Sequence, residues 1–534
     1  MKIVVLGGYG VFGSRLVRLL IRDGHDVVIA GRVIAQAQAL AREVGAAPLQ
    51  VDRQGDLTPL WAMAPDAVVD AAGPFHAYGA DPYGFARACI ARRVHYLDLA
   101  DDADFCAGIT ALDAAARAAG VFVLSGVSSV PAISSAAVAA LAEGAAEVDM
   151  ISSAILPGNR APRGRAVVES ILHQAGRPMV VSMDGVPVPV RSWSRPARFD
   201  LGQGMVRRGW MIAVPDQRLF AGAFKARTVL FHAGLELALM NWGLALLSWL
   251  RLRVPVGLVL WAAKLLAPFG TNAGGMSVAV TARYRDGWQR RVWRIIVRDG
   301  EGPFIPGVAA RAVLRDPSAI APGARPAVAQ VTLAAITEAM GDLAVTTERT
   351  CEEQTPLFIR QLGADFDKLP KAVQVAHQVY GPRRWSGRAS VTRGASLLSR
   401  MIAAVFRFPR ASDDIPVSVM MMPEQGGERW ERQFGSQVFV SHLHQQGNVM
   451  TERFGPLTFT LGLHVADGQL HFPVRSGRWG PIPLPRFLLP QSVASEHETD
   501  GVFHFDVALK APLTGALIVH YKGWLKAARD ITTP

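Results

Sequence analysis

Near the start of this 534-residue chain, a glycine-rich turn joins an apolar segment to an amphipathic one. Residues 3–6 are apolar throughout, as is typical of a strand buried on both faces of a parallel sheet. Residues 14–23 place leucine, valine and isoleucine side chains at helical spacing. Between these segments, residues 8–13 have the sequence Gly-Tyr-Gly-Val-Phe-Gly. A strand, a G-x-G-x-x-G turn and a helix in this order hold the diphosphate of a dinucleotide at the helix N-terminus, so the sequence predicts a dinucleotide-binding domain.

The alternation of strand and helix continues to about residue 125. Further apolar runs predict strands at residues 26–30, 48–51, 67–71, 94–99 and 121–124. Helical patterns lie between them at residues 35–44, 82–91 and 109–119. Repeated units of this kind fold as a doubly wound parallel sheet, so we predict an α/β, Rossmann-like domain over residues 1–125.

The end of the second predicted strand indicates which dinucleotide binds. NAD-binding domains usually have a carboxylate there for the ribose 2′-hydroxyl group. This chain has Arg32 instead, and a guanidinium suits a 2′-phosphate. We therefore predict NADP(H) as the cofactor, with the alternative that Arg32 only lies in a solvated loop. The predicted cofactor contacts in this part of the chain are Gly7, Gly8, Tyr9, Gly10, Val11, Phe12, Gly13, Arg32 and Asp52.

Three further stretches have a characteristic sequence and spacing. They are Asp-Ala-Val-Val-Asp-Ala-Ala-Gly-Pro-Phe at residues 66–75, His-Tyr-Leu-Asp-Leu at residues 95–99 and Gly-Val-Ser-Ser-Val-Pro at residues 126–131. Together with the glycine-rich start and Arg32, they resemble the saccharopine dehydrogenase-like, NADP-binding reductase family. The likeness is specific over about the first 135 residues and continues more weakly to about residue 345.

The resemblance implies that Ala72, Gly73 and Pro74 lie along the ribose and nicotinamide side of the cofactor. It also implies that Tyr96 and Asp98 face the substrate, which makes both of them candidate catalytic residues. For Asp98, general acid–base catalysis and a structural hydrogen-bonding role both stay open. For Tyr96, proton donation and packing in the core both stay open.

Two positions depart from the pattern of the family. Ala100, Asp101 and Asp102 stand where a Gly-Glu pair is often found, and Asp70 stands where asparagine is more usual. These departures concern the substrate side and leave the cofactor contacts intact.

Residues 126–345 have the mixed pattern of an α+β domain, which we assign to substrate binding and dimerisation. Within it, residues 277–284 and 290–297 predict a hairpin. Residues 228–269 are rich in Leu, Ala, Met and Trp, and we predict a hydrophobic helical segment there. Glu236 disfavours a membrane span, because a charge at mid-bilayer costs at least about 2.5 kcal/mol. A helical pair in a membrane interface, a lid over the substrate and a hairpin packed in the protein or in a homodimer stay open.

The C-terminal part, residues 355–534, resembles a domain of unknown function that is often fused behind such reductases. A helical stretch at residues 356–380 precedes short alternating runs separated by Gly and Pro, which predict an antiparallel β-rich domain, either a sandwich or a half-barrel. His442 and His444 share one strand face, but without an acid or cysteine at a telling spacing we interpret them as a solvated pair and predict no metal site.

Composition limits the functions that remain. Three cysteines without a C-x-x-C pair indicate a reducing compartment, so we expect the protein in the cytoplasm, with the inner membrane surface as an alternative. The net charge of +12 comes from dispersed arginines rather than a basic run, so no nucleic-acid partner is predicted.

The function predicted from the sequence is an NADP(H)-dependent oxidoreductase. It would transfer hydride to a C=C, C=O or C=N bond of a small, largely apolar substrate, acyl or lipid-like, because the middle domain is so apolar. A saccharopine-type C–N reductase and a non-catalytic NADP(H)-binding sensor or scaffold stay open as alternatives.

Overall fold

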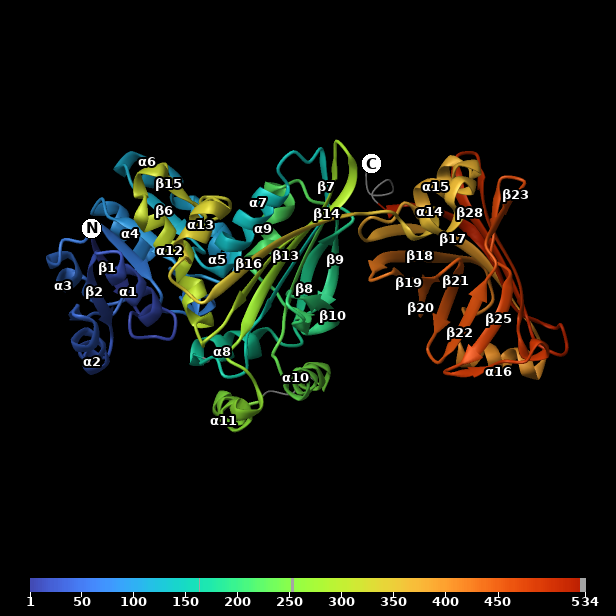
Figure 1. Cartoon of the computed structure of the whole chain (residues 1–534), viewed down its shortest axis with the longest axis horizontal. Helices are drawn as coiled ribbons and strands as arrows, with labels where there is room; N and C mark the ends of the chain where they lie inside the picture. Colours follow the sequence, from blue (N-terminus) through green and yellow to red (C-terminus); the bar gives the residue numbers. More distant parts are fainter. Residues whose placement is uncertain (163, 251–253, 529–534) are drawn as a thin grey trace. The chain divides into compact units, whose positions relative to one another are not determined.

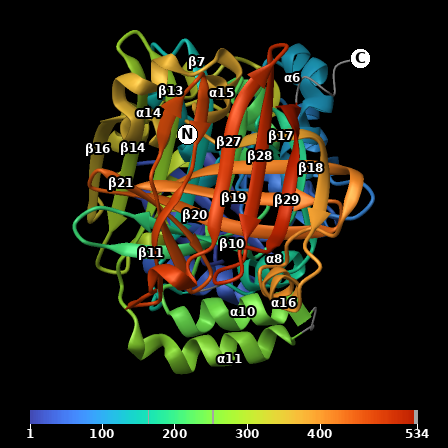
Figure 2. The ribbon, with the colours of Figure 1, turned by 90° about the vertical axis from the view of Figure 1, so that its right-hand side faces the viewer.

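The computed structural model describes residues 1–162, 164–250 and 254–528. These residues form two compact units (Figure 1), and Figure 2 shows the strands of the second unit face-on. As far as they are described, the first unit comprises residues 1–182, 187–285 and 289–352, and the second comprises residues 183–186, 286–288 and the chain from residue 353 onward. The first unit contains two seven-stranded sheets, and the second is built on a thirteen-stranded sheet.

The first sheet is parallel and has the strand order β15-β6-β5-β4-β1-β2-β3. Its strands are β1 (Lys2–Leu6), β2 (Asp26–Gly31), β3 (Ala47–Gln50), β4 (Ala67–Asp70), β5 (His95–Asp98), β6 (Phe122–Ser125) and β15 (Gly323–Pro326). The predicted doubly wound sheet is confirmed. Strand β15 comes from the range assigned to the middle domain, because the backbone of Gly323–Pro326 pairs with the open edge of β6. A boundary at residue 125 therefore does not separate the two sheets.

Helices cover both faces of this sheet (Figure 1). They include α1 (Gly13–Arg22), α2 (Ile34–Val44), α3 (Thr58–Ala62), α4 (Gly84–Ala91), α5 (Ala103–Gly108) and α6 (Asp113–Ala119). Ile3 and Val5 point into the core on one face, and Val4 and Leu6 point into the core on the other. This double burial explains why residues 3–6 of this strand are all apolar.

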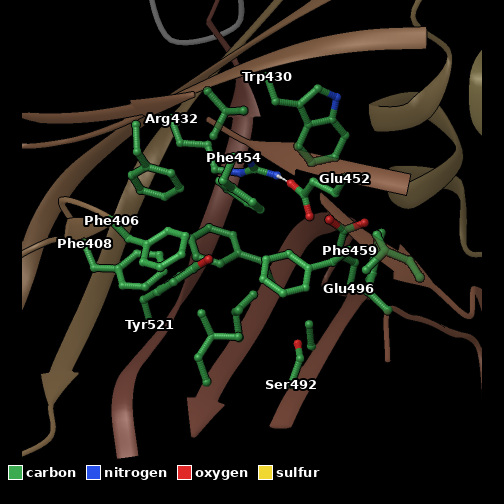
Figure 3. A pocket seen from close by; sticks show the side chains of 18 of the residues that line it. Phe406, Phe408, Trp430, Arg432, Glu452, Phe454, Phe459, Ser492, Glu496 and Tyr521 are labelled. Carbon is green, nitrogen blue, oxygen red and sulfur yellow. Dashed lines mark hydrogen bonds and ion pairs between the residues drawn. The ribbon is translucent and has the colours of Figure 1, made fainter. Parts of the chain in front are cut away.

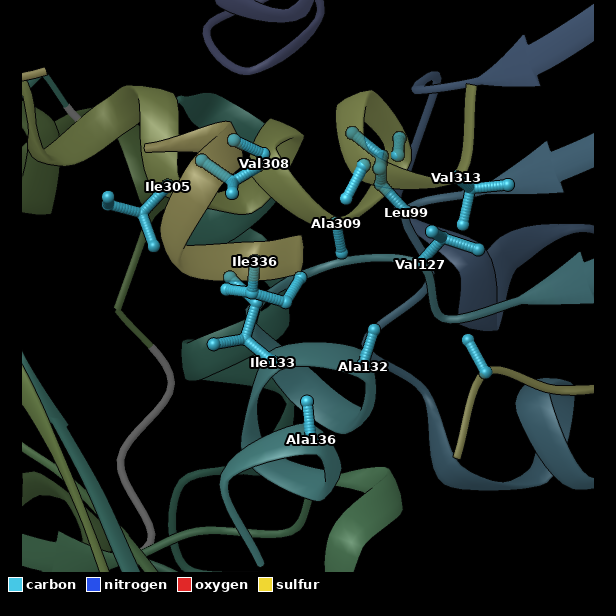
Figure 4. Close-up of a cluster of buried hydrophobic side chains, with 14 of the residues drawn as sticks. Leu99, Val127, Ala132, Ile133, Ala136, Ile305, Val308, Ala309, Val313 and Ile336 are labelled. Atoms are coloured by element: carbon cyan, nitrogen blue, oxygen red, sulfur yellow. The ribbon is translucent and has the colours of Figure 1, made fainter. Parts of the chain in front are cut away.

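Helix α12 (Ile305–Arg315) returns from the middle of the chain and packs against α1. Figure 4 shows its apolar residues Val308, Ala309 and Val313 in a cluster with Ile133 and Ile336. The core of the first sheet is therefore completed by segments that follow residue 125.

The second sheet is mixed, with the order β10-β11-β12-β7-β13-β14-β16. Its strands are β7 (Glu147–Leu156), β10 (Ser194–Asp200), β11 (Val206–Met211), β12 (Thr228–Ala233), β13 (Gly274–Tyr284), β14 (Gly287–Val297) and β16 (Val345–Glu353). Neighbouring β13 and β14 are the predicted hairpin. Around them lie helices α7 (Ser134–Leu141), α8 (Arg165–Gln174), α9 (Pro215–Ala223) and α13 (Leu333–Ala339), together with the small pair β8 (Pro178–Met183) and β9 (Val186–Arg191).

The predicted helical segment at residues 228–269 is wrong in its first part. Thr228–Ala233 forms β12, which pairs in parallel with β7. Val229 and Phe231 are apolar because this strand lies inside the sheet and is buried. Only α10 (Ala238–Leu250) and α11 (Val256–Leu266) are α-helical in the described part of the segment.

Glu236 anchors the base of this helical pair instead of lying inside a helix. Its carboxylate pairs with Arg207 at 2.9 Å and accepts hydrogen bonds from the backbone N–H groups of Asn159 (2.7 Å) and Thr271 (2.8 Å). The two helices extend from the lower edge of the first unit in Figure 1. Among the described residues, no helix has the length and apolarity needed to cross a membrane.

The second unit contains helices α14 (Leu357–Leu362), α15 (Lys371–His377) and α16 (Leu397–Val405) beside the large antiparallel sheet. The strands are β17 (Arg383–Arg393), β18 (Ser412–Glu424), β19 (Gly427–Phe434), β20 (Gln437–Gln446), β21 (Val449–Phe454), β22 (Leu457–Leu461), β23 (His464–Ala466), β24 (Gln469–His471), β25 (Val474–Trp479), β26 (Ile482–Pro483), β27 (Gln491–Thr499), β28 (Val502–Lys510) and β29 (Leu517–Ala527). Residues of both β22 and β27 line one cavity, so the sheet curves around it. The predicted antiparallel C-terminal domain is confirmed.

Candidate cofactor site

The glycine-rich turn approaches its neighbouring backbone so closely that side chains are excluded. Gly7 has a φ of +72° and donates its N–H to the Ala30 carbonyl at 2.8 Å. A Cβ atom at Gly13 would lie 2.2 Å from the Gly7 carbonyl oxygen. In the described part of the chain, the N–H groups of Val11, Phe12 and Gly13 find no acceptor. These donors, at the N-terminus of α1, are what a diphosphate group requires.

Tyr9 connects this turn to the loop that carries Arg32. A Cβ atom at Gly31 would lie 2.4 Å from the Tyr9 ring, and the Val33 N–H donates to the Tyr9 hydroxyl at 3.1 Å. The Arg32 side chain is exposed, and no acidic partner for it occurs among the described residues. Its guanidinium is therefore free to bind a 2′-phosphate group.

Asp52 lies in the loop after β3, and its contact with the cofactor stays a prediction. Its carboxylate is exposed and accepts the N–H of Gln54 at 3.1 Å, which stabilises the local turn. The neighbouring Arg53, which sequence analysis missed, donates to the Ala72 carbonyl at 3.2 Å and lies 3.2 Å from the centroid of the Tyr78 ring. Arg53 therefore contacts the loop that follows β4.

Asp70 holds that loop in place. Its buried carboxylate accepts the Ala72 N–H at 3.0 Å and the Tyr78 hydroxyl at 3.0 Å. Burial raises the pKa of Asp70 above its usual value. Because a Cβ at Gly7 would lie 2.9 Å from the Ala72 Cα, the loop that contains Ala72, Gly73 and Pro74 also borders the glycine-rich turn.

Asp98 and Tyr96, which the resemblance implies face the substrate, are both buried inside the domain. Asp98 is 0% exposed, and its carboxylate accepts hydrogen bonds from the Ala100 N–H (3.0 Å), the Ser125 hydroxyl (3.0 Å) and the Gly126 N–H (2.8 Å). Burial raises the pKa of Asp98 to about 7. Tyr96 packs in the core beneath the sheet. These hydrogen bonds favour a role for Asp98 in positioning the backbone after β5 and β6. Direct catalysis by Asp98 or Tyr96 stays a prediction.

A polar cluster that sequence analysis missed lies beyond Pro74. The rings of His76 and His173 have their centroids 4.5 Å apart, and the Ser170 hydroxyl lies 3.5 Å from an Asp101 carboxylate oxygen. His173 and Ser170 belong to α8, whereas His76 follows β4 and Asp101 follows β5 of the first sheet. Partial burial, Arg177 and His76 lower the pKa of His173. His76 directly follows Gly-Pro-Phe and could have been noticed, whereas nothing in the sequence links it to α8.

In the second unit, Glu424 joins His442 and His444. The side-chain ligand atoms of the three residues lie within 4.8 Å of one another, and His442 Nδ1 is 2.8 Å from a Glu424 oxygen. The three could hold a metal ion, so the interpretation of the histidines as a solvated pair overlooked an acid. It did so because Glu424 lies on β18 and reaches them only through strand pairing.

The parallel sheet, the glycine-rich turn and the free amides of α1 define a dinucleotide-binding domain. Residues 3–124 match the family model of the saccharopine dehydrogenase NADP binding domain, and residues 369–525 match that of a domain of unknown function (DUF4166). These are the two matches that the resemblance implied, one at each end of the chain. The predicted NADP cofactor is confirmed by the match to the NADP binding domain.

Solved structures provide further likenesses. The chain is similar to apo saccharopine dehydrogenase (L-Glu forming) from Saccharomyces cerevisiae, with 14% identity over 65% of this chain and 99% of that chain, at a TM-score of 0.47. It is also similar to a probable dehydrogenase from Thermotoga maritima, with 8% identity over 65% of this chain and 98% of that chain, at a TM-score of 0.32. No curated protein matches the chain.

Proposed function

We propose that the protein is an NADP(H)-dependent oxidoreductase that reduces a C=C, C=O or C=N bond of a largely apolar molecule. The observation that carries this proposal is the set of free N–H groups at Val11, Phe12 and Gly13, next to a guanidinium at Arg32 that is free of acidic partners. The N–H groups suit the diphosphate and the Arg32 guanidinium suits the 2′-phosphate, so these residues fit NADP(H).

The residues have separable roles in this proposal. The bound cofactor supplies or accepts the hydride. The chain binds and orients it through the glycine-rich turn, with Asp70 fixing the loop at Ala72–Pro74 and Asp98 fixing the turn at the end of β5. His76 follows the segment that resembles the nicotinamide-side loop of the family, so we assign it as the proton donor, with His173 beside it.

The proposed reaction is tested by NADPH oxidation with medium-chain enoyl thioesters, ketones and cyclic imines as substrates. We expect turnover with an apolar member of this set. His76→Gln should lower kcat by about 10²- to 10⁴-fold, because general acid catalysis typically contributes that much, and should leave the affinity for NADPH unchanged. His464→Gln, an exposed histidine in the second unit, is the matched control. Oxidation of NADPH by none of these classes would favour a sensor, and full activity of His76→Gln would remove His76 from the mechanism.

The exposed faces of α10 and α11 support a second part of the proposal, that these helices lie in a membrane interface. Leu239 is 72% exposed, Trp249 is 69% exposed and Trp261 is 61% exposed. A contiguous exposed apolar surface marks an interaction site, and tryptophan is enriched where membrane meets water. Two short helices with such faces suit adsorption to the surface of a bilayer.

Sedimentation with anionic lipid vesicles tests this interface. We expect the wild-type chain to sediment with vesicles and the double variant Trp249→Glu/Trp261→Glu to bind at least tenfold more weakly, because each buried tryptophan contributes about 1.5–3 kcal/mol. Trp479→Glu, at a tryptophan of the second unit that is also 61% exposed, should bind as the wild type does. Unchanged vesicle binding of the double variant, or loss of a dimer in its place, would contradict the membrane assignment.

A further inference from the structure

The second unit contains a cavity of about 160 Å³ on the inner side of its curved sheet (Figure 3). Its walls are mostly apolar and include the aromatic side chains Phe406, Phe408, Phe434, Phe459, Phe505 and Trp430. Protein interiors rarely leave voids larger than a water molecule. A cavity of about 150 Å³ with apolar walls admits benzene, so this cavity can hold one ring or a short hydrocarbon chain.

Each charged side chain in the wall already has a hydrogen-bonding partner. Arg432 donates to Glu452 at 3.2 Å and to the Ser441 hydroxyl at 2.7 Å, and its guanidinium lies 4.6 Å from the Trp430 ring. Glu496 is hydrogen-bonded to the buried His377 at 2.6 Å. The wall contains two carboxylates and one guanidinium, and the guanidinium is already paired with Glu452. The carboxylates would therefore repel an anionic ligand.

Tyr521 provides one of the hydroxyl groups of the wall, and Ser492 and Ser495 provide the others. The Tyr521 side chain is 9% exposed, and among the described residues its hydroxyl has no hydrogen-bond partner. Figure 3 shows this hydroxyl directed into the cavity. Burial, together with Glu452 and Glu496, raises the pKa of Tyr521 to about 12, so the hydroxyl keeps its proton and remains a donor. A ligand oxygen inside the cavity would accept a hydrogen bond from this hydroxyl.

We propose that this cavity binds the hydrocarbon part of a neutral molecule whose carbonyl oxygen accepts a hydrogen bond from Tyr521. The apolar walls provide the affinity, the hydroxyl selects a ligand with an accepting oxygen, and the carboxylates exclude fatty-acid anions. The site lies wholly within the second unit and does not depend on the reaction proposed for the first.

The test uses calorimetric titration of the full chain with 2-heptanone, heptanoate and toluene. We expect 2-heptanone to bind at one site per chain and heptanoate to bind at least tenfold more weakly. Tyr521→Phe should weaken 2-heptanone binding by about three- to tenfold, since one neutral hydrogen bond is lost, and should leave toluene binding unchanged.

A second pair of variants tests the location. Ala494 lines the cavity on β27, whereas its neighbour Val493 is 65% exposed. Ala494→Phe should abolish binding of all three probes, and Val493→Phe should bind them as the wild type does. The proposal is overturned if heptanoate binds as tightly as 2-heptanone, if Tyr521→Phe weakens neither probe or both equally, if Ala494→Phe still binds, or if the wild type binds neither neutral probe. NADPH affinity, measured on each variant, reports separately on the first unit.

Discussion

Gly13→Ala is expected to weaken NADPH binding by at least a hundredfold. The new Cβ would lie 2.2 Å from the Gly7 carbonyl oxygen and 3.0 Å from the Gly8 Cα, so only a shift of the backbone could relieve the clash. That shift would move the N–H groups that α1 presents to the diphosphate, and three hydrogen bonds to a charged group contribute about 1.5–3 kcal/mol each. NADPH titration by calorimetry measures the loss.

Gly222→Ala is the matched control for this substitution. Gly222 lies in helix α9, and no atom lies within 4 Å of the Cβ that alanine would add there. The control should bind NADPH as the wild type does. If Gly13→Ala binds NADPH with unchanged affinity, the diphosphate does not lie at this turn.

Arg311→Ala is expected to destabilise the first unit by about 3–5 kcal/mol, the usual effect of removing one partner from a buried ion pair. Arg311 is 2% exposed and donates to both carboxylate oxygens of Asp23 at 2.8 Å and to the Ala339 carbonyl at 2.9 Å. It thereby ties α12 to the end of α1. The free energy of unfolding in urea measures the effect. Arg117→Ala, which removes an exposed pair with Asp113, should change that free energy by less than about 1 kcal/mol.

The same ion pair predicts a dependence on pH. Burial alone would raise the pKa of Asp23, but the hydrogen bonds from Arg311 and Arg315 outweigh burial and hold this pKa well below its usual range. A carboxyl group with a depressed folded-state pKa contributes stability that is fully present above about pH 4 and is lost as the pH falls further. The difference in unfolding free energy between the wild type and Arg311→Ala should therefore shrink below about pH 4. A constant difference down to pH 2 would contradict the pairing.

Local sequence predicted the first sheet and the turn well, because their signals lie within a few residues of one another. The apolar run at residues 3–6 and the glycines at Gly8 and Gly13 are sufficient to place a strand, a turn and a helix. Strand β15 was missed because its pairing with β6 joins positions about 200 residues apart, and four residues that include Pro326 give no strand signal.

The hydrophobic segment shows a different limit. Thr228–Ala233 and the helices after it are all rich in apolar residues, and composition does not distinguish a buried strand from an exposed helix. Glu236 lies between β12 and α10, and its partner Arg207 lies on β11, so this pair could be found only in the folded chain.

The glycine-rich part of the candidate site could be predicted because its sequence pattern is local. The His76–His173 contact was missed because its two side chains come from distant elements. The contacts of Tyr9 with Gly31 and Val33 explain why an aromatic residue lies in the turn. The approach of His173 to His76 depends on the docking of α8, which no local pattern specifies. The resemblance implied that Asp98 faces the substrate. In the structure, the N–H groups of Ala100 after β5 and Gly126 after β6 hold its carboxylate inside the domain.

Calorimetric titration of the wild-type chain with NADPH and with NADH tests the central claim most directly. We expect one NADPH site per chain and at least tenfold weaker binding of NADH, because only the 2′-phosphate can form charge-assisted hydrogen bonds with Arg32. Absence of heat with NADPH, or equal affinity for the two nucleotides, would contradict this claim.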